Sequence, residues 1–414
     1  MTTQLPIVVV GGGTAGCTVV STLAAMTTQP IVLIEPGSPS VHDDESAFFT
    51  VLSDEALSRE VQTTLVDGGM DMPYVQAQVL GGGSAINGLL LTGEEPSFLS
   101  GLTRMATEED CGQVGTALLA ENGRFSRLWW NGGRWNPGRA VQHLVEEGRV
   151  TVIPESVTYL EHAQRVIKVA HTTNEAIEGS LFVMCAGALA TPALLLHSSL
   201  ERAVSGIGDG LQNHPTITFT LVLKDTVSQR FDATVVRESC SSSGADLLTV
   251  AYERTNADNT TAGLLSVSLM NPESRGGVWR SNTAMQHDFN MLATMRDRVA
   301  MREAVRELIS TAMSASFSAI SHQVLVDAEG TSVEVLDAMK NAELDEWIAV
   351  HLAVVSHAAS SCHDIVDSDG KVRGVGNLYI ADSSILHSVP PCSPAGPVVI
   401  EAARIARAIG ETLT

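Results

Sequence analysis

The stretch Ile7-Val8-Val9-Val10-Gly11-Gly12-Gly13-Thr14-Ala15-Gly16 decides the fold of this chain. Four consecutive apolar residues, three of them Val, are typical of a parallel strand that is buried on both faces. A helical pattern follows to about Met26, and Ile31–Glu35 reads as a second strand. The sequence thus has the pattern GxGxxG between a strand and a helix, which predicts a dinucleotide-binding α/β unit.

Each glycine of this pattern has its own expected role. Gly11 permits the tight turn, Gly13 lets backbone N–H groups approach a pyrophosphate, and Gly16 lets the helix pack closely on the strand. Glu35, at the end of the second strand, stands where an acid binds a ribose hydroxyl. These residues predict dinucleotide binding and leave FAD and NAD open.

Composition excludes several classes of function. The chain has 414 residues, 44% of them hydrophobic and 17% charged, which predicts a globular protein of two or three folding units. A net charge of −22 argues against a nucleic-acid partner. The six cysteines show neither CxxC nor metal-ligand spacing, so reduced thiols and no metal site are expected. There is no apolar run long enough for a membrane span and no signal peptide, so we expect a cytoplasmic protein.

The middle of the chain changes character. Residues 38–75 read as polar and irregular, and the glycines of Val79–Gly88 predict a backbone surface for a flat or phosphorylated ligand. Strands are expected at 150–153, 166–169 and 181–184, followed by a helix that starts at Thr191-Pro192. From Thr216 to about Val278 an alternating pattern predicts an antiparallel sheet with one exposed face. We expect helices at 293–313, at 333–354, and from near Pro397 to before Gly410.

These elements predict a Rossmann-like dinucleotide-binding domain, α/β in class, with an inserted domain of antiparallel sheet and helices. The first domain would be discontinuous, comprising 1–45, 76–215 and 355–414. Residues 46–75 would form a short lid or connection, and 216–354 would form the substrate-binding domain.

Four segments, Gly11–Glu35, Gln78–Gly88, Cys185–Ser198 and His357–Glu401, resemble the glucose–methanol–choline (GMC) oxidoreductases. Gly206–Pro215 resembles that family's GVGxxLxDHP run, and Asn271–Arg275 resembles its HPxSRG run. The resemblance spans nearly the whole chain in family order. It implies an FAD enzyme that oxidises alcohols, with the substrate-domain sheet covering the reactive face of the flavin.

The resemblance also implies roles for single residues. Glu35 would bind the adenine ribose, the backbone of Val157 would meet the adenine, and Asp382 would lie near the ribityl chain. Ile86 stands where some relatives carry the histidine that binds FAD covalently, so we expect non-covalent FAD. The remaining expected cofactor-binding residues are Gly11, Gly13, Thr14, Ala15, Gly16, Gly82, Gly83, Asn87, Ala186, Gly187, Pro394 and Ala395.

His357 is the expected general base, because His357–Cys362 resembles the family's HxxGTC run. Imidazole titrates near neutral pH, so it can take the hydroxyl proton while hydride passes to flavin N5. His351 and His387 are the alternative candidates. The unpaired N–H groups at the start of the final helix would stabilise anionic reduced flavin.

The chain departs from the family at Ser393, the second expected catalytic residue, which replaces the usual His or Asn. The segments between Asn87 and Arg134 and between Leu196 and Gly206 are short, which predicts a smaller lid over the flavin. A small-molecule alcohol is the expected substrate, and a bulky redox cofactor such as mycofactocin is the alternative that the smaller lid favours. An electron-transfer flavoprotein and a non-redox lyase or decarboxylase remain alternatives. The sequence leaves open the substrate, the electron acceptor (oxygen, quinone or protein) and the oligomeric state.

Overall fold

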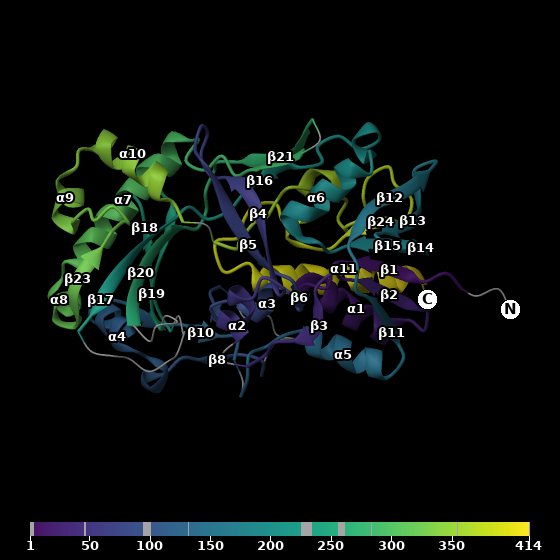
Figure 1. The fold of residues 1–414 in the computed structure, drawn as a ribbon, viewed down its shortest axis with the longest axis horizontal. Coiled ribbons are helices and arrows are strands. Elements are labelled where there is room, and N and C mark those ends of the chain that lie inside the picture. The colour runs from purple at the N-terminus through teal and green to yellow at the C-terminus, as the bar shows by residue number, and fades with distance from the viewer. Residues whose placement is uncertain are drawn as a thin grey trace.

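A computed structural model describes residues 4–44, 47–93, 101–130, 132–224, 234–255, 261–282, 284–353 and 355–413. A parallel sheet and a larger antiparallel sheet dominate it, and they lie on opposite sides of the molecule in Figure 1. The predicted fold class, a Rossmann-like α/β unit with an inserted antiparallel unit, is confirmed.

The parallel sheet is formed by strands from both ends of the chain. Its order is β11 (Val150–Ile153), β2 (Ile31–Ile34), β1 (Ile7–Val10), β15 (Leu181–Met184) and β24 (Leu378–Ile380). Helices α1 (Thr14–Met26), α5 (Gly138–Glu146) and α11 (Ala395–Leu413) pack on one face. The other face meets α6 (Gly187–His197) and a meander of β12 (Val157–Ala163), β13 (Val166–Thr172) and β14 (Ala176–Glu178).

Burial on both faces explains why β1 is apolar throughout. Ile7 and Val9 belong to the core under α1 and α11, whereas Val8 and Val10 belong to the core on the opposite face. All four are at most 5% exposed. From β1 the chain first builds the sheet toward β2 and later toward β15, so the strand order reverses between β1 and β15. Ligands of open α/β sheets bind at such a reversal, outside the carboxyl ends of the strands.

The antiparallel unit contains the predicted alternating strands. Its order is β23 (Ser321–Leu325), β17 (Thr216–Leu223), β20 (Thr261–Leu269), β19 (Asp246–Thr255), β18 (Val235–Cys240) and β9 (Arg124–Phe125). The long helix α7 (Met295–Ala312) packs on β20, and α4 (Gln113–Ala120) packs on β18 and β19. The remaining helices of this region are α8 (Ala315–Ile320), α9 (Val333–Ala338) and α10 (Asn341–His351).

The expectation that residues 38–75 are irregular is wrong. They contain β3 (Ser38–Val41), α2 (Ala47–Ser53), β4 (Ser58–Thr64) and β5 (Asp71–Ala77). β4 and β5 form a hairpin in a sheet with β16 (Asp209–Leu211), β21 (Gly276–Ser281) and β22 (Ala284–Asp288). Many residues of the hairpin are exposed and polar, so β4 and β5 lack the run of apolar residues by which a buried strand is recognised. The predicted domain boundaries stay a prediction.

Short elements complete the first half of the chain. They are β6 (Val79–Leu80), α3 (Gly83–Ile86), and a small sheet of β7 (Leu90–Leu91), β10 (Arg127–Leu128) and β8 (Arg104–Met105). None of the helices in the described ranges is both long and apolar enough to cross a membrane.

Three helix boundaries differ from expectation, each for a local reason. The expected helix at 333–354 is two helices, because the backbone turns extended at Met339 and Lys340. α6 begins at Gly187, before the expected Thr191, and encloses Pro192. α11 continues past Gly410, where a Cβ atom would lie 2.7 Å from the sulfur of Met26, so the glycine permits close packing on α1.

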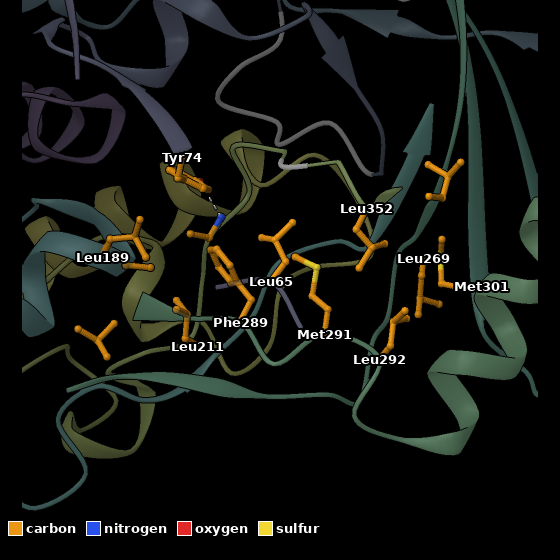
Figure 2. Close-up of a cluster of buried hydrophobic side chains, with 14 of the residues drawn as sticks. Leu65, Tyr74, Leu189, Leu211, Leu269, Phe289, Met291, Leu292, Met301 and Leu352 are labelled. Atoms are coloured by element: carbon orange, nitrogen blue, oxygen red, sulfur yellow. Dashed lines mark hydrogen bonds between the residues drawn. The ribbon is translucent and has the colours of Figure 1, made fainter. Parts of the chain in front are cut away.

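A continuous apolar core joins the two units (Figure 2). It brings together Leu189 of α6, Tyr74 of β5 and Leu269 of β20. Tyr74 packs on Phe289 with ring centroids 5.9 Å apart. The Tyr74 hydroxyl accepts the Ala358 N–H at 3.1 Å, the dashed contact in Figure 2. This contact fixes the backbone next to His357.

Candidate active site

The first glycine loop has the geometry that a dinucleotide requires. Gly11 has φ +102°, and a Cβ there would lie 2.5 Å from the Cys185 carbonyl oxygen at the end of β15. A Cβ on Gly16 would lie 1.8 Å from the Gly11 oxygen. A Cβ on Gly13 would meet no atom within 4 Å. Gly11 and Gly16 therefore permit close backbone contacts within the protein, whereas Gly13 borders open space.

Glu35 is bonded within the loop region itself. Its carboxylate accepts the Gly12 N–H at 2.6 Å and the Gly37 N–H at 2.7 Å. Burial raises the pKa of Glu35, and these two N–H groups oppose that rise. The carboxylate thus fastens the glycine loop to the end of β2, and its predicted contact with a ribose stays a prediction.

The second glycine segment lies directly on the first. A Cβ on Gly82 would lie 2.8 Å from the Gly13 Cα. The Thr14 hydroxyl donates to the Gly81 oxygen at 3.2 Å and shares a 2.8 Å hydrogen bond with the Ser84 hydroxyl. A Cβ on Gly83 would meet no atom within 4 Å. Two segments about 70 residues apart therefore border one open region.

Asn87 directly follows α3, at the second glycine segment. Asn87 Oδ1 accepts a hydrogen bond from Arg134 Nη1 at 2.7 Å. Its Nδ2 is buried and lacks a partner among the described residues, and so does the Trp129 indole N–H. A buried donor without a partner is costly, but neither atom is accessible to a bound group. The open space beside Gly13, Gly83 and Gly187 is what fits a dinucleotide that carries a flavin.

Asp382 organises the carboxyl end of β24. It is buried, and it accepts the Gly187 N–H at 2.8 Å, the Thr191 hydroxyl at 2.6 Å and the Ser384 N–H at 2.9 Å. Burial raises its pKa, and these hydrogen bonds oppose the rise. Gly187, with Ala186 as the preceding cap residue, has φ +85° and borders open space. Asp382 thus holds the start of α6 at the strand reversal, and its contact with a ribityl chain stays a prediction.

The segment after His357 lies against the same edge of the sheet. The Ser360 and Cys362 N–H groups donate to the carbonyls of Ser383 and Ser384 in the short helix η5 (Ser383–Ile385). The Ser361 hydroxyl donates to the Ala188 carbonyl at 2.6 Å. Pro192 has no N–H for that carbonyl four residues earlier, so Ser361 replaces the missing helical bond.

The His357 side chain contacts a second histidine. His357 Nδ1 lies 2.8 Å from His214 Nδ1, and the rings are nearly perpendicular at 88°. Burial lowers the pKa of His357 to about 4. Burial first, and the His357 charge second, lower the pKa of His214 to about 3. Both imidazoles are therefore neutral near pH 7. The sequence analysis gave His214 no role, although it lies in the run Gly206–Pro215 that resembles GVGxxLxDHP.

The alternative bases have other contacts. His351 Nδ1 bonds the Trp347 carbonyl at 2.7 Å, its Nε2 lies 3.2 Å from Glu329, and its ring stacks on Trp347. His387 meets His363 edge to face with ring centroids 5.0 Å apart. His351 is the last residue of α10, in the antiparallel unit.

Ser393 contacts its surroundings through its backbone, whose N–H donates to the Thr92 hydroxyl at 2.8 Å. Next to it, burial raises the pKa of the Cys392 thiol to about 11, so this thiol is protonated near neutral pH. α11 begins at Ala395, directly after Pro394. Of the other predicted residues, Ala15 is buried in α1 and Val157 begins β12. All six cysteines are free.

The fold is that of a two-unit protein, with a Rossmann-type parallel sheet, glycine segments at its strand ends and an antiparallel unit that shares its core. Residues 272–402 match the family model described as GMC oxidoreductase. The chain is 29% identical over 291 residues to an uncharacterized GMC-type oxidoreductase of Sinorhizobium fredii, covering 64% of this chain and 54% of the relative. It is 23% identical to a 5-(hydroxymethyl)furfural oxidase of Methylovorus sp., covering 97% of this chain and 98% of the relative. About the last third of the chain therefore matches the GMC oxidoreductase model, and the chain is similar to GMC-type oxidoreductases.

Solved structures agree with this fold. Pyridoxine 4-oxidase from Mesorbium loti has a TM-score of 0.82 at 18% identity, covering 98% of this chain and 99% of that one. A formate oxidase of Aspergillus oryzae, studied for its FAD modification, has a TM-score of 0.80 at 15% identity, covering 100% and 99%. The chain spans about half the length of the first three curated relatives it matches, at 54%, 48% and 53%.

Proposed function

We propose that this protein is an FAD-dependent oxidoreductase that oxidises an alcohol, with His357 as the general base. The observation that carries the proposal is the neutral imidazole of His357 against His214, in a segment whose next residues bond to the chain just after β24. The family supports FAD, because the formate oxidase structure concerns FAD and the furfural and pyridoxine enzymes are oxidases by name.

The glycine segments would hold the cofactor by backbone. Gly13, Gly83 and Gly187 border open space, so phosphate and ring atoms can approach their N–H groups without meeting a side chain. Bound FAD would supply the hydride acceptor. Ile86 is 8% exposed, packs among apolar residues and has no nucleophilic atom, so the cofactor is held non-covalently. Acid precipitation should release all yellow colour into the supernatant.

His357 would take the hydroxyl proton of the alcohol. Its imidazole is neutral near pH 7, so a ring nitrogen has a lone pair to accept that proton. General-base catalysis typically contributes about 10²–10⁴-fold in rate. The first N–H groups of α11 have no partner within the helix, and they would add positive potential at its start.

An anaerobic alcohol panel tests the proposal. Under argon, at least one primary or secondary alcohol should bleach the flavin absorbance of the purified protein. His357→Gln should slow that bleaching by about 10²-fold or more, from the size of general-base effects. His351→Gln is the matched control, because it changes a histidine in α10 and should leave the rate near that of the wild type. No bleaching by any alcohol would contradict the proposal.

A second candidate is a flavoprotein that exchanges electrons with a bulky redox cofactor without oxidising an alcohol itself. Ser393 favours it, because a short hydroxyl cannot act as the cationic partner that His provides. The two candidates differ at His357. Electron transfer alone should survive His357→Ala nearly unchanged, whereas alcohol oxidation should not. Air reoxidation of the reduced flavin then separates an oxidase, which reoxidises fast, from a dehydrogenase.

A further inference from the structure

The contact between His214 and His357 carries more information than a packing contact. Two imidazoles share one hydrogen bond between their Nδ1 atoms, at 2.8 Å. One Nδ1 must carry the hydrogen and the other must present a lone pair, since two N–H groups or two lone pairs would face each other otherwise. The partners of His214 decide which arrangement holds.

His214 Nε2 lies 3.0 Å from the Pro390 carbonyl oxygen, and the Met270 backbone also favours the protonated ring. A carbonyl oxygen only accepts, so Nε2 carries a hydrogen and donates it. A neutral imidazole has one N–H, which leaves a lone pair on His214 Nδ1. The Nδ1 of His357 is then the donor of the shared bond, and the Nε2 of His357 has the free lone pair.

The surrounding backbone fixes both rings in this relation. Gln212 and Ala359 exchange two backbone hydrogen bonds of 3.0 Å each, so the two histidine segments pair directly. The Asn213 side chain donates to the Val355 carbonyl at 2.7 Å and accepts the His214 N–H at 2.9 Å.

Gln212, which pairs with Ala359, also holds the segment that carries the Pro390 carbonyl. The Gln212 side chain accepts the Val389 N–H at 3.0 Å, which holds the residue next to Pro390. His214 is 1% exposed, so water does not compete for its ring nitrogens.

We propose that His214 is a positioning residue that holds His357 in the tautomer with hydrogen on Nδ1 and a free lone pair on Nε2. This inference rests on the proposed role of His357 as the base. In the reaction, the hydroxyl proton would move to Nε2, and the Nδ1–H bond to His214 would be kept. The resulting imidazolium has one hydrogen on each nitrogen, with Nδ1–H still donating to the lone pair of His214.

Nuclear magnetic resonance of the wild-type holoprotein tests the tautomer without any activity. With ¹⁵N-labelled histidine rings at pH 7, the His357 signals should show a protonated Nδ1 and an unprotonated Nε2. The His214 signals should show the reverse. A His357 ring that carries its hydrogen on Nε2 would overturn the inference. Because the measurement uses the wild-type protein, it does not depend on the folding of any variant.

Paired variants test the positioning. His214→Asn places an amide oxygen near the former Nδ1 and keeps an acceptor for His357, whereas His214→Leu removes it. With an alcohol that the wild type oxidises, kcat of His214→Leu should fall about 10- to 100-fold while KM stays nearly unchanged, from the size of general-base effects. His214→Asn should recover most of that loss. Equal losses in both variants, or no loss in either, would contradict a positioning role.

The outcomes separate this inference from the proposed function. If His357→Gln keeps full turnover, the base assignment fails whatever tautomer the resonances report. If His357→Gln loses turnover but the resonances show hydrogen on its Nε2, only the role of His214 fails. His143→Asn, with a side chain 65% exposed, is the control for replacing a histidine far from the pair in sequence.

Discussion

Replacing His214 by Asn should change the number of protons that the protein takes up when it unfolds. His214 is buried, and burial together with the His357 charge lowers its pKa to about 3. An unfolded histidine has a pKa of about 6.5. Between these two values the unfolded state carries a proton on this residue and the folded state does not. Asn has no such group, so the variant removes that difference.

The magnitude follows from the two pKa values. At pH 5 a histidine with a pKa of about 6.5 is roughly 97% protonated, and one with a pKa of about 3 is roughly 1% protonated. Unfolding of the wild type should therefore take up about one proton more than unfolding of His214→Asn. Because the folded pKa is lowered, the neutral ring stabilises the fold above about pH 6.5. That contribution is lost as the pH falls toward 3, with about 2 kcal/mol already lost at pH 5.

A pH-stat measurement reads this number directly. Holoprotein at pH 5 in dilute buffer is mixed with guanidinium at the same pH, and the acid needed to hold the pH is recorded for each protein. Released cofactor contributes equally to both and cancels in the difference. His143→Asn is the control, because its side chain is exposed and meets water in both states.

A difference of less than about 0.3 proton between the wild type and His214→Asn would refute the reasoning. It would mean that His214 is already charged in the folded protein at pH 5. A charged ring donates from both nitrogens, so it could not accept from His357 Nδ1. The proton count therefore tests the same lone pair that the tautomer assignment requires.

Three further outcomes are expected. Gly16→Ala should prevent folding, as judged by circular dichroism, because its Cβ would lie 1.8 Å from a backbone oxygen. Gly13→Ala should fold, because its Cβ would enter open space, but it should bind FAD at least tenfold more weakly in a fluorescence titration. The acid limb of kcat/KM should lie near pH 4, where His357 gains its proton, and a limb near pH 7 would contradict the lowered pKa of this base. Ser361→Ala should cost about 1–3 kcal/mol in unfolding free energy by denaturant titration, because it leaves the Ala188 carbonyl without its partner; an unchanged midpoint would show that this bond is dispensable.

The elements that sequence reasoning located well are those whose signal is local. β1, α1 and β2 combine a buried apolar strand, a glycine turn and a helix in one short stretch, so each pattern supports the next. The alternation in β17 and β20 was also clear, because one face of that sheet packs on α7. These features need no knowledge of distant partners.

The parts that were missed depend on distant contacts. β4 and β5 are stabilised by pairing with each other and by a sheet assembled from residues near 210 and 280, which their own sequence does not show. The early start of α6 depends on Ser361, about 170 residues away. Its hydroxyl donates to the Ala188 carbonyl in place of the N–H that Pro192 lacks. His214 becomes noteworthy only when its Nδ1 is seen beside that of His357, 143 residues later.

This last contact changes how the departure at Ser393 is understood. The loop before α11 was expected to supply a second catalytic side chain, and a serine stands there. In the structure this loop contributes backbone groups: the Pro390 carbonyl accepts from His214, and the Ser393 N–H donates to Thr92. A backbone carbonyl cannot titrate or change its role from acceptor to donor. It can therefore define the tautomer of His214, and through it that of His357, without any particular side chain at position 393.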